Sequence, residues 1–104
     1  LPWELAKAFD HSAVISSLIP KEEFSNVSDV AFSLQKNGQE VQRGNTKDVL
    51  FSFDYLIAYI SERITLRKGD LIYTGTPEGV GPVQIGDQLV GYLQEQRMFS
   101  CTIK

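Results

Sequence analysis

The chain has 104 residues, of which 42% are hydrophobic and 22% charged, and its formal net charge is −3. This composition is typical of one globular domain rather than of a disordered chain. Lysine and arginine are scattered, so no nucleic-acid surface is expected, and no apolar run approaches the roughly 20 residues that span a bilayer. The single cysteine, Cys101, excludes an internal disulfide and favours a reducing compartment.

The first residues, LPWELAKAFD, begin without an initiator methionine, so we expect the chain to be part of a longer protein. Residues 1–20 have no helical period and predict extended segments. Lys7 lies among apolar residues, and in an extended segment it shares a face with Leu5 and Phe9. A lysine on an apolar face is rare unless it is paired, although its long stem also lets the ammonium reach water.

Residues 30–45 predict a β-hairpin. Val30, Phe32 and Leu34 alternate with small or polar residues, which is the period of a strand with one buried face. The pair Asn37-Gly38 follows, and this pair is preferred where both residues of a two-residue turn have positive φ.

One helix is predicted over residues 52–64. Its apolar residues recur at i, i+3, i+4, i+7 and i+11: Phe53, Leu56, Ile57, Ile60 and Ile64. Ser52 is placed to accept a hydrogen bond at the helix N-terminus. We expect the apolar stripe to contact the core, and Tyr55 and Tyr59 to share one flank.

The remaining segments predict short strands. DLIY at 70–73 is one, and residues 85–104 alternate well enough for two more with a turn near Glu95 and Gln96. One helix with about six short strands indicates an α+β, β-rich fold. A doubly wound parallel sheet is not expected, because the strands do not alternate with helices.

TGTPEGVGPVQIGD, residues 74–87, contains four glycines and two prolines. It matches neither the P-loop, nor the dinucleotide fingerprint, nor the Gly-x-Ser-x-Gly nucleophile elbow. A wide turn with glycines at positive φ explains the spacing. Thr76 favours a ligand-binding loop instead, because its short hydroxyl stands between Gly75 and Pro77, where bare backbone lets a small ligand approach.

Other positions carry weaker indications. His11 is the only histidine and cannot form a two-histidine metal pair. Glu22 and Glu23 are adjacent in a polar connector, where neighbouring side chains point apart and chelate poorly. Cys101 lies in a strand-like alternation and is expected to pack as a small hydrophobe.

Two stretches, PWELAKAFD and LRKGDLIYTGTPEGVGPVQIGD, together resemble the C-terminal half of the fumarylacetoacetate hydrolase family, above all its short members that act on 2-oxo acids. IPKEEF, KNGQE and QRGNTKDVLFSFDYLIAYIS fit in the same order. The resemblance implies a mixed β-sheet roll and a homodimer, in the cytoplasm or in mitochondria. It also implies that residues 1–104 are the C-terminal portion of a single catalytic domain whose N-terminal part is missing.

The resemblance further implies a magnesium or manganese site, bound by a Glu-x-Glu pair and a later aspartate. All these ligands are expected before Leu1, so no metal ligand is expected in this chain. Lys7 corresponds to the family's active-site lysine. Thr76 corresponds to the threonine that hydrogen-bonds the substrate carboxylate, with the backbone of Gly75 beside it.

The implied function is that of a metal-dependent hydrolase, decarboxylase or isomerase of small 2-oxo acids, acting through an enolate that the metal stabilises. The substrates would be oxaloacetate, acylpyruvates or dioates of aromatic degradation, and the 104-residue chain alone is expected to be inactive. The late glutamate of the larger fumarylacetoacetases has no place here, which counts against fumarylacetoacetate itself. Two alternatives stay open: a non-catalytic binding or structural domain that retains the fold, and a stand-alone β-rich module.

Overall fold

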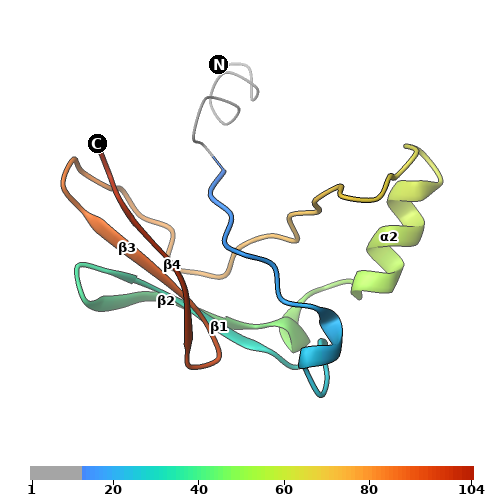
Figure 1. The fold of residues 1–104 in the computed structure, drawn as a ribbon, viewed down its shortest axis with the longest axis horizontal. Helices are drawn as coiled ribbons and strands as arrows, with labels where there is room; N and C mark the ends of the chain where they lie inside the picture. The colour runs from blue at the N-terminus through green and yellow to red at the C-terminus, as the bar shows by residue number, and fades with distance from the viewer. Residues whose placement is uncertain (1–12) are drawn as a thin grey trace.

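Four antiparallel strands form one sheet in the structure, a computed structural model that describes residues 13–104. In spatial order the strands are β2 (Gln39–Asn45), β1 (Ala31–Lys36), β3 (Gln88–Leu93) and β4 (Gln96–Thr102). The other elements are the helix α2 (Phe53–Ser61) and the 3-10 turns η1 (Lys21–Glu23) and η2 (Thr46–Asp48), shown in Figure 1. The α+β, β-rich class is confirmed, although the described residues form four strands where about six were expected.

The predicted hairpin is confirmed as β1 and β2. Between these strands Asn37 and Gly38 have φ angles of 53° and 83°, the left-handed backbone that such a two-residue turn requires. A β-bulge between Leu34 and Gln35 of β1 leaves Val41 of β2 without a partner in the ladder. The backbone of Val41 is therefore free to contact another segment.

Strands β3 and β4 confirm the two strands predicted after residue 85. Their turn residues, Gln94 and Glu95, lie one position earlier than expected, and Gln94 has a φ of 54°. The strand predicted at 70–73 is wrong, because those residues pair with no strand of the described chain. Ile72 and Tyr73 instead line a hollow over the sheet, so the apolar run serves contact with a sheet face rather than pairing at an edge.

The predicted helix is confirmed, but it is shorter than its apolar stripe. The hydroxyl of Ser52 accepts a hydrogen bond from the Tyr55 N–H at 3.1 Å, as a capping residue should. The helix ends at Ser61, and the turn that follows is tighter, because the Arg63 N–H donates to the Ile60 carbonyl three residues earlier.

The apolar stripe of α2 does not contact a core within residues 13–104, so that expectation is wrong. Ile57 and Ile64 are 48% and 65% exposed, and Figure 1 shows α2 standing apart from the sheet. The flank prediction is confirmed, because the rings of Tyr55 and Tyr59 stack with centroids 6.2 Å apart. The helical period therefore marks an apolar face, but it does not say what covers that face.

Two aromatic rings cover glycines on one face of the sheet. A methyl group at Gly44 would lie 2.7 Å from the ring of Phe32, and one at Gly91 would meet the ring of Phe99. Large rings that lie over cross-strand glycines fill the space the missing side chains leave. Among the described residues, Val30, directly before β1, is the one fully buried hydrophobic residue, at 4% exposure.

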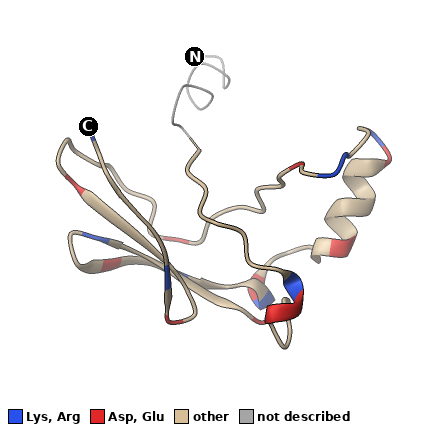
Figure 2. Ribbon diagram, viewed as in Figure 1, with Lys and Arg blue, Asp and Glu red and all other residues tan. Residues whose placement is uncertain are grey.

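The described chain is open in shape. Its radius of gyration is 15.2 Å, against about 13 Å for a compact domain of 100 residues. Figure 2 shows acidic and basic positions interleaved rather than gathered on one element. None of the helices described within residues 13–104 has the length and apolar character that crossing a membrane requires.

Candidate functional site

The glycine-rich loop, residues 74–87, folds back onto the β1–β2 hairpin and is tied to it at several points. Gly75, Gly79 and Gly86 have φ angles of 110°, 106° and 95°, so the expected left-handed glycines are confirmed. Gly81 does not adopt this conformation. The loop thus has a defined path instead of a plain reversal between strands.

Gln42 of β2 holds the centre of this loop. Its side-chain nitrogen, Nε2, donates a hydrogen bond to Thr76 Oγ1 at 2.9 Å and another to the Pro77 carbonyl at 3.0 Å. Gln42 is half-buried while Thr76 is exposed. The amide therefore joins the strand to the loop and leaves the threonine open to a ligand.

Two glycines allow the loop and the strand to approach closely. A Cβ atom at Gly79 would meet the carbonyl oxygen of Val41, the residue that the bulge leaves unpaired. A Cβ atom at Gly44 would lie 3.2 Å from Cβ of Pro77. A side chain at Gly79 would force strand and loop apart, because backbone cannot give way as a flexible side chain can.

A network of three hydrogen bonds fixes the end of the loop to the turn of the β1–β2 hairpin. Asp87 accepts hydrogen bonds from Asn37 Nδ2 at 2.9 Å and from the Gln84 N–H at 2.8 Å. Asn37 Oδ1 in turn accepts from the Gln88 N–H at 2.9 Å. The hydrogen bond from Asn37, with smaller effects from Gln84 and from the charge of Lys36, lowers the pKa of Asp87 below its usual 3.8.

Gly75 and Thr76 lie at the rim of an apolar hollow of about 620 Å³. Its floor is the sheet face that carries Phe32 and Phe99, and its sides are the extended segments 14–18 and 72–77. Gly75 and Thr76 also line a second hollow of about 500 Å³. A hydroxyl at the rim of an apolar hollow is the arrangement by which small-molecule sites orient a ligand.

Arg43 is the basic side chain lining the second hollow. Its guanidinium is held by Glu40, with a shortest contact of 2.5 Å, and both side chains are largely exposed. The hydrogen bond from Arg43 lowers the pKa of Glu40, because it stabilises the ionised carboxylate. The positive charge of Arg43 is thus neutralised next to the loop.

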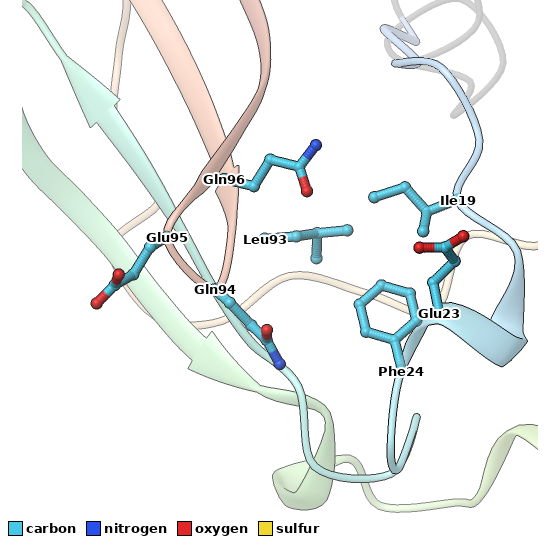
Figure 3. A pocket seen from close by; sticks show the side chains of 7 residues that line it. All are labelled: Ile19, Glu23, Phe24, Leu93, Gln94, Glu95 and Gln96. Carbon is cyan, nitrogen blue, oxygen red and sulfur yellow. The ribbon is translucent and has the colours of Figure 1, made fainter.

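A further hollow of about 400 Å³ lies between the β3–β4 turn and η1 (Figure 3). Ile19, Phe24 and Leu93 point toward one another there, and the Glu23 carboxylate lies beside them, while Glu95 points away. This hollow brings together neither a nucleophile with a base nor two facing carboxylates. It offers less chemistry than the hollow beside Thr76.

The described residues do not fit a metal ion. Between residues 13 and 104 no three or more His, Cys, Asp or Glu side chains gather in a way that could hold one. Cys101 is half-buried in β4 opposite Leu89, as expected for a small hydrophobe. Lys7 and His11 fall outside the described residues, so the structure gives no position for either.

Comparison with known proteins decides the family. The model of the fumarylacetoacetate hydrolase C-terminal domain matches residues 1–103. The chain belongs to the fumarylacetoacetate hydrolase family. Over 89 residues it is 48% identical to oxaloacetate tautomerase YcgM of Escherichia coli and 45% identical to the mitochondrial oxaloacetate tautomerase FAHD1 of Homo sapiens. These matches cover 85% and 86% of this chain, but 41% and 40% of the relatives.

Solved structures of the fumarylacetoacetate hydrolase family share this fold. A family protein from Yersinia pestis matches 99% of this chain and 48% of its own, with a TM-score of 0.92 and 46% identity. Maleylpyruvate hydrolase from Sphingobium, in complex with manganese(II) and pyruvate, matches 83% of this chain and 33% of its own, with a TM-score of 0.77 and 31% identity. The chain therefore spans about half the length or less of these relatives.

Sequence analysis predicts Thr76 and Gly75 as substrate-binding residues, but it does not single out Gln42, which the structure places in contact with Thr76. A glutamine in an alternating strand is normally a solvent-facing residue, and nothing in its neighbours distinguishes it. Its role depends on the loop, more than 30 residues later, folding back over β2. Only the contact between these two distant segments reveals it.

Proposed function

We propose that the protein is an enzyme that processes small 2-oxo acids, and that this chain supplies the loop that binds the substrate carboxylate. The names of its relatives support the proposal, since they include oxaloacetate tautomerases and a maleylpyruvate hydrolase with bound pyruvate, itself a 2-oxo acid. Because the chain spans only about 40% of the length of the curated relatives, the proposal assigns the activity to the complete gene product.

The observation that carries the proposal is the fixed position of Thr76. The loop is tied to β2 through Gln42 at 2.9 and 3.0 Å, yet the threonine itself remains exposed at the rim of the apolar hollow. Donors held in place before the ligand arrives bind it without further ordering cost. A loop that only reversed the chain would need none of these ties.

Each residue of the proposed site has a simple role. The hydroxyl of Thr76 donates to one carboxylate oxygen, and Gly75, with no side chain and open space around it, lets the carboxylate come close to the backbone. The apolar hollow takes the carbon chain of the substrate and limits water around it. Lys7 is the proposed cation of the active site and lies outside the described residues.

A divalent ion, magnesium or manganese, forms part of the proposal, with its ligands assigned outside residues 13–104. The complex of the Sphingobium hydrolase with manganese(II) supports a metal in this family. In the proposal, the metal ligands come from the part of the domain that the relatives have beyond these residues. The same part covers exposed apolar side chains such as Leu18 and Ile85, which are 77% and 84% exposed. A homodimer remains part of the same proposal.

The test is a substrate panel with the complete gene product, supplied with magnesium or manganese. Oxaloacetate, acetylpyruvate and maleylpyruvate are assayed for enol–keto conversion, decarboxylation and C–C cleavage. Turnover of at least one that is lost with Thr76→Val supports the proposal. No turnover of any of them by the folded protein would contradict it and favour a non-catalytic domain.

A further inference from the structure

Gln42 does more than anchor the loop, because its hydrogen bonds have a determined direction. The amide end of a glutamine can be placed in two ways, with nitrogen and oxygen exchanged, and the neighbours decide which is right. Here one neighbour is the Pro77 carbonyl, 3.0 Å away. A carbonyl oxygen can only accept, so the amide nitrogen must face it.

The same nitrogen is 2.9 Å from Thr76 Oγ1. The two hydrogens of the Gln42 amide therefore go to Pro77 and to Thr76, and the threonine oxygen is an acceptor in this contact. A hydroxyl carries a single hydrogen and two lone pairs. With one lone pair used by Gln42, the hydrogen of the Thr76 hydroxyl points elsewhere. Among residues 13–104, the hydroxyl takes part in no side-chain hydrogen bond in which it is the donor.

We propose that Gln42 is a positioning residue that presents the Thr76 hydroxyl as a hydrogen-bond donor to an anionic oxygen at the rim of the hollow. This inference rests on the proposed function, because it assumes that Thr76 meets the substrate carboxylate. The inference also explains how the site would select its ligand. A hydroxyl fixed as a donor favours a carboxylate oxygen, which accepts a hydrogen bond, over a ligand group that can only donate one.

The test uses two nearly isosteric replacements of Gln42. Gln42→Glu places a carboxylate beside Thr76, so that the hydroxyl donates to the new side chain and turns a lone pair toward the ligand. Gln42→Met removes the hydrogen bonds, but it leaves the hydroxyl free to rotate and donate. If Gln42 only anchored the loop, both changes would weaken ligand binding similarly, because each removes the two hydrogen bonds that the Gln42 amide donates.

The measurement is calorimetric binding of pyruvate to the complete gene product with manganese(II). We expect Gln42→Glu to weaken binding about tenfold or more, as when a hydrogen bond to a charged group is lost, and Gln42→Met to weaken it clearly less. Lowering the pH from 7.5 to 5.0 should reduce the deficit of Gln42→Glu, because the introduced carboxyl regains a donor as it protonates. The deficit of Gln42→Met, relative to the parent protein, should not change with pH.

A second background separates this inference from the proposed function. In the Thr76→Val background, Gln42→Glu should cost far less affinity than in the parent, because the hydroxyl through which it acts is gone. Equal losses for Gln42→Glu and Gln42→Met at every pH would overturn the positioning role and leave the proposed function intact. If Thr76→Val itself binds pyruvate as tightly as the parent, the role of Thr76 in the proposed function is wrong, and the inference on Gln42 falls with it.

Discussion

Three glycines of the loop at residues 74–87 allow two effects of an added side chain to be measured separately: backbone strain at positive φ, and a steric clash of the new Cβ atom. At Gly79, an alanine would be strained by the φ of 106° and would also meet the Val41 carbonyl. At Gly75, the φ of 110° gives the same strain, but no atom lies within 4 Å of the new Cβ. At Gly81, the backbone is ordinary and the space is open.

The expected losses of unfolding free energy follow from these differences. Left-handed backbone costs a non-glycine residue about 1–3 kcal/mol, and overpacking adds about 1–3 kcal/mol. We therefore expect Gly75→Ala to cost about 1–3 kcal/mol and Gly79→Ala about 2–6 kcal/mol. Gly81→Ala should stay within about 0.5 kcal/mol of the parent.

Urea unfolding of the three variants measures these differences, provided that the m-value is unchanged. Amide hydrogen exchange over residues 74–82 adds a local readout, because detachment of the loop from β2 would raise exchange there first. Equal losses at Gly75 and Gly79 would refute the close approach of the loop to Val41. A loss at Gly81 as large as that at Gly79 would refute the whole assignment of strain and contact in this loop.

Three further changes test other contacts. Protonation of Asp87 should weaken its hydrogen bonds to Asn37 and Gln84. Because the pKa of Asp87 is lowered in the folded state, its stabilising effect is fully present above the usual pKa of about 3.8 and is lost as the pH falls below that value. In acid unfolding, the variant Asn37→Ala should therefore lose less stability with falling pH than the parent does. Ser52→Ala removes the cap of α2 and should lower helix stability by about 1 kcal/mol, seen as faster amide exchange in α2 and no change in β1. Gly91→Ala places a methyl group against the ring of Phe99 and should cost about 1–3 kcal/mol in urea unfolding; an unchanged midpoint would mean that the ring does not lie there.

Local features of the fold could be predicted from the sequence where a short pattern determines the backbone. Asn37-Gly38 specifies the hairpin turn by its need for positive φ, and Ser52 specifies the start of α2. The prediction of a strand at 70–73 is wrong, because an apolar run shows that the side chains are apolar but not whether the segment pairs with a strand edge or packs on a sheet face.

The site was predictable only in part. Thr76 and Gly75 stand out because a hydroxyl and bare backbone in a glycine-rich loop are unusual for a plain turn. Gln42 could not be found in this way, since its importance comes from a contact with a segment 34 residues away. The functions of Thr76, Gly75 and Lys7 stay predictions until they are measured.

The most direct measurement of the central claim is kcat/KM of the complete gene product, carrying Thr76→Val or Thr76→Ser, for the 2-oxo acid that it turns over. Loss of one hydrogen bond to a carboxylate should lower kcat/KM about 10- to 150-fold in Thr76→Val. Thr76→Ser keeps the hydroxyl and should remain close to the parent. A Thr76→Val enzyme as active as the parent would contradict the claim that this loop binds the substrate carboxylate.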